Sequence, residues 1–197
     1  MGRRVPTQRR LVRNSRTPQR LPPLQDRLDS PLDILFVGIN PGIRSALTGH
    51  HFAGYSNRFW KLLFDAALVP RPVTYIDDHV LPQWRLGITN LASRPTRGIG
   101  DLRPSEYAHG RQALLTKIEH TRPRVVALVG VTLARALCDE TRPATHGTLR
   151  LGLQPWRLAS APVFVLSNPS GRNAHYSYPQ MLASFRALRR YSTHRPR

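Results

Sequence analysis

Short runs of apolar residues alternate along the chain with segments whose apolar residues recur at helical spacing. The runs are continuously apolar, which is typical of strands buried on both faces. They predict four strands, at residues 33–39, 86–91, 124–130 and 163–167. The helical pattern predicts helices at residues 57–68, 104–120, 132–138 and 178–191. This alternation predicts an α/β fold with a parallel sheet covered on both faces.

Individual residues support the predicted element boundaries. Pro104 suits the first turn of its helix, and Glu106 suits the positive end of that helix dipole. Ser56 or Asn57 is available to cap the first predicted helix. A hairpin-like stretch at residues 148–158 leads into the last strand.

The two ends of the chain differ from the part between them. Residues 1–30 hold eight arginines, two aspartates and four prolines, with only scattered apolar residues. Such a segment buries too little surface to offset the entropy of ordering it, so we predict a disordered basic arm. We predict a second, short basic tail at residues 191–197 and a single domain over residues 31–190.

The charge of the chain is strongly one-sided. Lys and Arg number 30 against 11 Asp and Glu, a net charge of +19, and the excess is not confined to the N-terminal arm. A protein this basic attracts polyanions, and nucleic acid is the commonest of them. The longest apolar run, residues 125–131, is far shorter than the roughly 18 residues of a membrane span, so no membrane contact is expected.

The motifs of several enzyme classes are missing from the sequence. Neither lysine follows a glycine, which excludes a P-loop, and there is no G-x-S-x-G elbow. The single cysteine, Cys138, excludes an intrachain disulfide and a four-cysteine iron–sulfur cluster. The histidines show no H-x-x-H spacing, and we interpret the pair His50 and His51 as loop or DNA-contacting residues. We therefore expect no metal and no cofactor.

Two Asn-Pro turns follow predicted strands. Residues 38–42 form GINPG after the first strand, and residues 168–171 form NPSG after the last. Each alone is also an ordinary turn sequence. In open α/β sheets, ligands bind outside the carboxyl ends of the strands. Two such turns at one edge of the sheet therefore predict a binding site there.

With these motifs the sequence resembles the mismatch-specific uracil-DNA glycosylase branch of the uracil-DNA glycosylase superfamily, the branch that includes thymine-DNA glycosylases. The resemblance covers roughly residues 33–190, and its motifs are GINPG at 38–42, T-G-x-x-F-A at 48–53, N-R-F-W at 57–60, R-P-T at 94–96 and NPSG at 168–171. It implies a three-layer α/β/α sandwich around a parallel sheet of about four strands. It also implies hydrolysis of the glycosidic bond of a uracil flipped from duplex DNA, without metal or cofactor.

The resemblance also suggests which residues hold the base. An enzyme that acts on a base inside a duplex must take it out of the stack and grip it. Phe52 would be the stacking wall, although its residue type also suits a core aromatic. The main-chain amides of Ile39 and Phe52 would hold the uracil carbonyl. Asn90, at the end of the second strand, offers one acceptor and one donor to uracil N3–H and O4, or is simply a turn residue.

Asn40 occupies the position that orients the attacking water in this branch. An amide positions water but carries no charge, whereas the oxocarbenium-like state of glycosidic cleavage favours a nearby carboxylate. We hypothesise that Asp101, in the loop after the second strand, supplies this charge. Alternatively, Asp101 only precedes and caps the helix that starts at Pro104. The remaining acids considered are placed at the wrong end of the sheet or on helical surfaces: Asp33, Asp65, Asp77 and Asp78.

Gly42 stands where the uracil-strict branch of the superfamily carries a bulky tyrosine, and Ser45 lies close by in the sequence. An open pocket at this point predicts tolerance of 5-substituted or enlarged bases. In the second motif, Gly171, Arg172 and Asn173 would form the wedge that fills the vacated stack. An apolar residue is frequent where Arg172 stands, but arginine can stack on bases and bond the widowed guanine. The remaining predicted DNA-contacting residues are Asn168, Ser170 and His175.

These features predict a monofunctional DNA repair glycosylase that removes uracil and related damaged or mismatched pyrimidines, for example opposite guanine. Two alternatives stay open. A DNA-base methyltransferase needs a glycine-rich cofactor loop after the first strand, where Asn40 and Pro41 stand instead. A non-enzymatic DNA-binding protein accounts for the arginines but not for GINPG or NPSG. We expect a cytoplasmic, nucleoid-associated monomer.

Overall fold

The computed structural model describes residues 21–96, 99–138 and 149–193. Five strands form one sheet in the order β2-β1-β3-β5-β4. Their bounds are β1 Ile34–Gly38, β2 Leu86–Asn90, β3 Val125–Val129, β4 Gly152–Leu158 and β5 Ala161–Leu166. Because β1, β2, β3 and β5 run parallel, the four-stranded parallel sheet predicted from the sequence is confirmed.

The sheet has a fifth strand where the sequence predicted only a hairpin-like stretch. β4 lies antiparallel to β5 at the edge of the sheet. Its side chains alternate between more and less exposed, as expected of a strand with one solvated face. Pro155 is tolerated there because an edge strand does not need every N–H for pairing. The stretch is therefore one arm of a hairpin whose other arm is β5.

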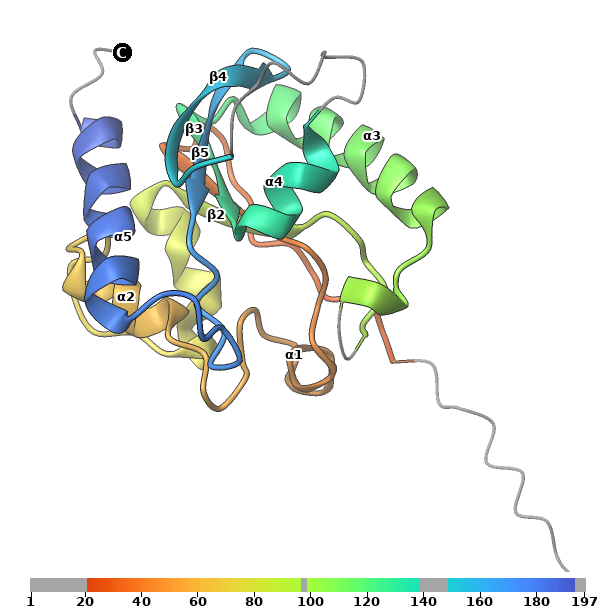
Figure 1. Cartoon of the computed structure of the whole chain (residues 1–197), viewed down its shortest axis with the longest axis horizontal. Helices are drawn as coiled ribbons and strands as arrows, with labels where there is room; N and C mark the ends of the chain where they lie inside the picture. Colours follow the sequence, from red (N-terminus) through yellow and green to blue (C-terminus); the bar gives the residue numbers. More distant parts are fainter. Residues whose placement is uncertain (1–20, 97–98, 139–148, 194–197) are drawn as a thin grey trace, which may run out of the picture.

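Helices cover both faces of the sheet (Figure 1). On one face lie α2 (Phe59–Asp65), the 3-10 helix η1 (Tyr75–Trp84) and α5 (Tyr178–Thr193); on the other lie α3 (Pro104–Thr121) and α4 (Val131–Leu137). Successive side chains of a strand point to opposite faces, so in β1 Phe36 packs with the first layer and Val37 with the second. This is the predicted three-layer α/β/α sandwich.

The predicted helices agree with the structure to within two residues at each end, except the first. That helix, α2, is shorter than the predicted range 57–68. The N-cap of α2 is Arg58, without a side-chain cap, so the prediction of Ser56 or Asn57 as cap is wrong. The Oδ1 of Asn57 nevertheless accepts the backbone N–H of Phe59 at 2.9 Å. Beyond the helix, Ala67 takes a left-handed conformation with φ +53°, which cannot continue it.

Two short helices that the sequence did not predict lie in the connections after β1 and β2. They are α1 (Ile43–Thr48) and the 3-10 helix η2 (Ile99–Asp101). The two connections touch where Gly42, which precedes α1, forms an isolated parallel bridge with Thr96. The segments leaving the two strands are therefore held together at the carboxyl edge of the sheet.

The chain joins the domain earlier than predicted. Arg27 and Ile88 of β2 exchange two backbone hydrogen bonds of 2.9 Å each. The Asp26 carboxylate accepts the Thr89 hydroxyl at 2.6 Å and pairs with Lys117 at 2.7 Å. The prediction of a disordered arm over 1–30 is therefore wrong for this part, because its polar groups find partners along the edge of β2. Residues 1–20 lie outside the described residues.

The final helix extends further than predicted. α5 continues to Thr193, and Tyr191 packs against the core. The start of the tail predicted at 191–197 therefore belongs to the domain, and residues 194–197 lie outside the described residues. Among the residues that the structure describes, no helix is long and apolar enough to cross a membrane.

Candidate active site

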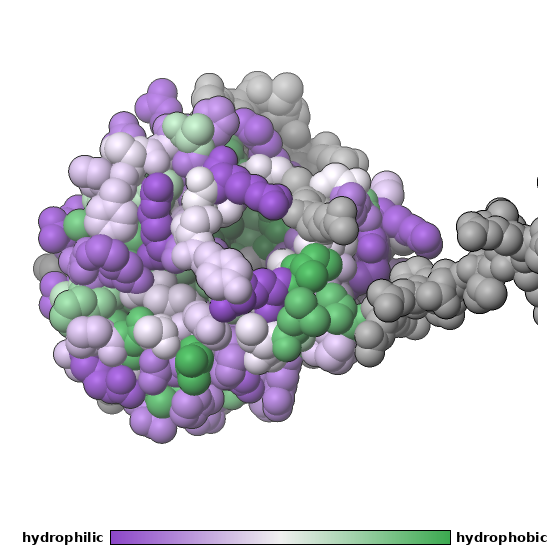
Figure 2. Space-filling model, turned by 90° about the horizontal axis from the view of Figure 1, so that it is seen from below, coloured by the Kyte–Doolittle hydropathy of each residue, from purple (hydrophilic) through white to green (hydrophobic). Residues whose placement is uncertain are grey.

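A cavity of about 740 Å³ lies at the carboxyl edge of the parallel strands, a volume typical of small-molecule sites. Figure 2 views the molecule from below and shows a hollow with hydrophobic side chains inside and beside it. The walls come from the turn after β1, the segment between α1 and α2, the end of β2 and the turn after β5. Of the predicted site residues, those lining the cavity are Ile39, Asn40, Gly42, Ser45, Phe52, Asn90, Asn168, Ser170 and Arg172.

The side chain of Asn40 reaches from the turn after β1 to the connection after β2. Its Nδ2 donates to the Thr96 hydroxyl at 2.7 Å and to the carbonyls of Pro41 at 3.1 Å and Arg94 at 3.4 Å. These acceptors fix which end of the amide is the donor and direct Oδ1 away from them. An amide oxygen accepts a hydrogen bond from water but does not ionise. Asn40 therefore presents an amide oxygen that can accept a hydrogen bond from a water molecule.

Phe52 forms an apolar wall of the cavity. Its ring stacks on Phe59, with centroids 4.1 Å apart and planes at 22°. Its φ of +50° is rare for a bulky residue and persists only where the surroundings enforce it. The next residue supplies that enforcement, because the Ala53 N–H donates to Ser45 Oγ at 3.1 Å and its carbonyl accepts from Arg44 Nε at 2.6 Å. The buried Ser45 hydroxyl thus holds the loop that presents Phe52.

Asn90 lies at the end of β2, directly opposite Gly38 of β1. A Cβ added to Gly38 would lie 2.5 Å from Asn90 Oδ1 and 3.5 Å from Cζ of Phe52. Only glycine therefore lets the carboxamide and the aromatic ring come together at this point. The first glycine of GINPG is required by this contact.

The buried ring of His51 lies behind Asn90. Its Nδ1 is 3.4 Å from Asn90 Nδ2, and its Nε2 is 3.0 Å from the Gln25 carbonyl oxygen. Burial lowers the pKa of His51. His51 lies in a loop, as one of the two interpretations had it, but the DNA-contacting alternative is wrong, because only 1% of the residue is exposed. Its partners lie 26 and 39 positions away, so no local pattern revealed them.

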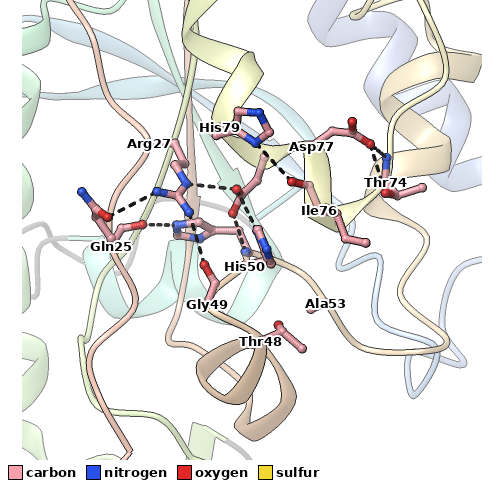
Figure 3. A network of polar contacts seen from close by, with 12 residues as sticks. Gln25, Arg27, Thr48, Gly49, His50, Ala53, Thr74, Ile76, Asp77 and His79 are labelled. Atoms are coloured by element: carbon pink, nitrogen blue, oxygen red, sulfur yellow. Dashed lines mark hydrogen bonds and ion pairs between the residues drawn. The ribbon is translucent and has the colours of Figure 1, made fainter.

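A second buried group, Asp78, fixes the backbone of the same loop; two of its partners, Arg27 and His50, are labelled in Figure 3. Its Oδ1 accepts from Arg27 Nε and His50 Nδ1, both at 3.0 Å, and its Oδ2 accepts the His51 N–H at 2.9 Å. The prediction that Asp78 lies on a helical surface is wrong, because the residue is fully buried. A buried carboxylate needs partners, and here they come from the N-terminal segment and the loop before Phe52.

The NPSG turn after β5 forms another wall of the cavity. The Oδ1 of Asn168 accepts the N–H of Ser170 at 3.0 Å, and the Asn168 carbonyl accepts from Asn173 Nδ2 at 2.7 Å. The Oδ1 of Asn173 in turn accepts the N–H of His175 at 3.1 Å. These bonds fold the segment onto itself, so it presents a defined shape.

The predicted wedge stands at the rim of the cavity. A Cβ on Gly171 would lie 2.2 Å from Ser56 Oγ, so only glycine lets this turn approach the segment before α2. Arg172 lines both the main cavity and an adjoining cavity of about 270 Å³, and Asn173 and His175 line only the adjoining one. The structure thus brings the predicted wedge next to the residues predicted to hold the base.

The structure does not bring Asp101 into the cavity. Asp101 ends η2, is exposed, and is not one of the lining residues. Its carbonyl accepts from Arg94 at 2.6 Å, and Arg94 forms two 2.7 Å bonds with Glu106. The pKa of Glu106 is lowered to about 2, most strongly by the hydrogen bond from the Arg94 guanidinium and next by the hydrogen bond from the Arg103 N–H. A catalytic role for the Asp101 carboxylate stays a prediction. The cap of the helix that starts at Pro104 is supplied by Glu106, whose Oε2 accepts the Arg103 N–H at 2.8 Å.

The groups around the cavity suit a planar heterocycle. Phe52 offers a face on which a ring can stack, and Asn90 offers a hydrogen-bonding edge. Asn40 can aim a water at an atom attached to that ring. Within the described ranges, no group of three His, Cys, Asp or Glu side chains is placed to hold a metal ion.

The structure is an α/β/α sandwich whose cavity, at the carboxyl edge of the sheet, is lined by an aromatic ring and by side-chain amides. The chain belongs to the uracil DNA glycosylase superfamily, whose family model matches residues 26–190. The match begins at Asp26, where the structure shows the chain joining the edge of β2.

The chain is also similar to a G/U mismatch-specific uracil DNA glycosylase of Schizosaccharomyces pombe. The two are 39% identical over 150 residues, which cover 73% of this chain and 45% of that relative. The chain thus matches less than half the length of this relative.

Proposed function

We propose that the protein is a DNA glycosylase that flips uracil out of DNA and hydrolyses its N-glycosidic bond, leaving an abasic site. The observation that carries this proposal is the convergence of Asn40, Phe52 and Asn90 on one cavity. They come from three separate segments and suit three separate needs, which are to position water, to stack on the base and to bond its edge. Membership of the superfamily and likeness to a G/U mismatch-specific relative support it.

Base recognition follows from the cavity wall. A flipped uracil stacks on Phe52, and base flipping is the general way in which an enzyme reaches an atom buried in a duplex. The Oδ1 of Asn90 accepts from N3–H, and its Nδ2 donates to O4. The main-chain N–H groups of Ile39 and Phe52 donate to a uracil carbonyl.

Bond cleavage needs a nucleophile and stabilisation of the leaving base. The water held by Asn40 attacks C1′ of the sugar while the bond between C1′ and N1 of uracil breaks. The bonding electron pair leaves with the base, so negative charge develops on its carbonyl oxygens. N–H donors fixed beside those oxygens stabilise this charge without reorganising during the reaction. The water oxygen stays on C1′, and one water proton passes to solvent.

The substrate range follows from the rim of the cavity. An added Cβ at Gly42 meets nothing within 4 Å, so no side chain narrows the cavity there. This favours acceptance of 5-substituted pyrimidines beside uracil. Arg172, at the rim, can bond the guanine left opposite the extruded base, which favours substrates mismatched with guanine.

Alkaline strand cleavage tests the proposal directly. Three end-labelled DNAs are compared: uracil opposite guanine, uracil opposite adenine, and uracil in a single strand. Alkali-labile product is expected with the native protein and is expected to be lost in Asn40→Ala. Gln112→Ala, which changes an exposed carboxamide on α3, is the matched control and should keep full activity.

The same experiment separates the alternatives. Intact strands with all three DNAs, despite tight binding, would refute the glycosylase and leave the two alternatives, a DNA-binding protein and a methyltransferase. Transfer of a labelled methyl group from S-adenosylmethionine to duplex DNA would instead support a methyltransferase.

A further inference from the structure

The two ring nitrogens of His51 have partners of different kinds. Nε2 lies 3.0 Å from the Gln25 carbonyl oxygen, which can only accept a hydrogen bond. Nε2 must therefore carry the proton of the neutral ring. Nδ1 is then an acceptor, and the Nδ2 of Asn90, 3.4 Å away, is the group that donates to it.

The surroundings keep this ring neutral. The residue is 1% exposed, and desolvation is the largest influence on its pKa, which is lowered from the ordinary value. The Gln25 carbonyl and the carboxylates of Asp78 and Asp26 oppose the shift, and the guanidinium of Arg27 adds to it. At neutral pH the order of donors and acceptors from Gln25 to Asn90 is therefore fixed.

This order decides how the Asn90 carboxamide is turned. With Nδ2 toward His51, the acceptor Oδ1 lies beside Gly38 at the cavity wall. The reversed amide would set Oδ1 against the lone pair of Nδ1, two acceptors facing each other. The neutral ring thus removes one of the two orientations that an asparagine side chain can otherwise adopt with little difference in shape.

The orientation matters because uracil and cytosine have the same shape and opposite polarity at one edge. Uracil presents a donor at N3 and an acceptor at O4, whereas cytosine presents an acceptor at N3 and a donor at its 4-amino group. A cavity left open at Gly42 cannot separate them by size. A site that rejects a substrate by leaving polar groups unpaired discriminates far better than one that relies on volume.

We propose that His51 is a positioning residue that sets selectivity for uracil over cytosine by holding the Asn90 carboxamide in one orientation through the Gln25 carbonyl. The proposal rests on the proposed function for its substrate, but the proton arrangement on which it depends can be measured without any turnover.

The first test is the tautomer of His51 in the full chain. Long-range ¹H–¹⁵N correlation spectra at neutral pH report which ring nitrogen carries the proton, and His51→Gln identifies the signals. A protonated Nε2 with a bare Nδ1 is expected. A proton on Nδ1, alone or in an imidazolium ring, would overturn the proposal whether or not the protein cleaves DNA.

The second test compares two replacements of the ring. His51→Leu keeps bulk but removes the acceptor, and we expect the ratio of uracil to cytosine excision to fall about tenfold, the usual worth of one hydrogen bond. His51→Gln can accept through Oε1 and donate through Nε2, and should keep the ratio. An unchanged ratio in His51→Leu would overturn the proposal.

A double-mutant cycle separates positioning from general support. If His51 acts through Asn90, His51→Leu should have no further effect on the ratio once Asn90→Ala is present. An equal effect in both backgrounds would contradict the proposal. Titration of the protein with free uracil and free cytosine, followed on the Asn90 side-chain NH₂ signals, reads the same selectivity as binding. A protein that cleaves no DNA, yet favours uracil in this titration and loses that preference in His51→Leu, would refute the proposed function and support the role of His51.

Discussion

The side-chain amide of Asn40 donates to the hydroxyl of Thr96 across 2.7 Å, joining the turn after β1 to the connection after β2. The two segments are also bridged by the backbone of Gly42 and Thr96. Nearby, the Arg94 carbonyl accepts from the same amide nitrogen, and Arg94 is held by Glu106. The orientation of the Asn40 side chain is thus fixed by residues 54 and 56 positions later in the sequence.

The Thr96 hydroxyl should matter for the rate more than for binding. Thr96→Ala removes the shortest of the three acceptors of Asn40, and loss of one such bond lowers kcat about tenfold. KM should change little, because Thr96 acts through Asn40 and not through the base. Single-turnover and steady-state rates on a uracil–guanine duplex check this. Thr96→Ser keeps the hydroxyl and should stay near the native rate; equal losses in both variants would contradict the account.

Asp78 should dominate the stability of the loop that carries Phe52. Asp78→Ala leaves Arg27, His50 and the His51 N–H without their shared acceptor, and breaking a buried ion pair in this way costs about 3 kcal/mol. For a chain of this size the expected loss in Tm is about 6–12 °C. Asp77→Ala, next to it in η1, removes an exposed cap of Thr74 and should cost only about 1 kcal/mol. Thermal melts followed by circular dichroism compare the two, and equal shifts would argue against the network.

The Arg94–Glu106 pair should give the protein a pH-dependent stability. The pKa of Glu106 is lowered from 4.5 to about 2 in the folded chain, so folding favours the ionised form. Its contribution is fully present above about pH 4.5 and is lost as the pH falls toward 2. Glu106→Gln should therefore lower Tm at pH 7, and the difference from the native protein should vanish as the pH approaches 2. Glu119→Gln, on the exposed side of the same helix, is the control, and a difference that persists at low pH would contradict this.

Gly42 should control the width of the substrate range. Its φ of −69° is ordinary for any residue, and the space around an added Cβ is open, so Gly42→Tyr can fold. The tyrosine would project into the cavity, and we expect excision of thymine to fall at least about tenfold relative to uracil, because the 5-methyl group loses its space. Gly42→Ala is the control, and the ratio of rates on matched duplexes is the measurement. An unchanged ratio in Gly42→Tyr would contradict this account of the cavity.

The sequence predicted the parallel core of the fold because its strands are continuously apolar. Such a run can be identified in the sequence without knowing which strand it pairs with. It did not predict β4, whose alternating exposure resembles a surface hairpin. Disorder over residues 1–30 was predicted from their composition. Composition does not reveal that Asp26 and Arg27 form hydrogen bonds and ion pairs with residues of β2, η1 and α3.

The cavity residues were predicted because they stand in motifs at the ends of strands, where a parallel sheet gathers its ligands. The residues that hold them were missed. His51, Asp78 and Thr96 are polar and buried, and each finds its partners at least 26 positions away. Buried polar side chains resemble surface ones in a sequence, and only the fold distinguishes them.

Release of free uracil tests the central claim most directly. Excess protein is incubated with a uracil–guanine duplex, and the free base is measured by chromatography for the native chain, Asn40→Ala, Asp101→Asn and the control Gln112→Ala. We expect uracil from the native protein and the control, and none from Asn40→Ala. Asp101 stands outside the cavity, and an undiminished amount from Asp101→Asn would refute its predicted catalytic role. No free uracil from native protein that binds the duplex, or equal release by Asn40→Ala, would contradict the account.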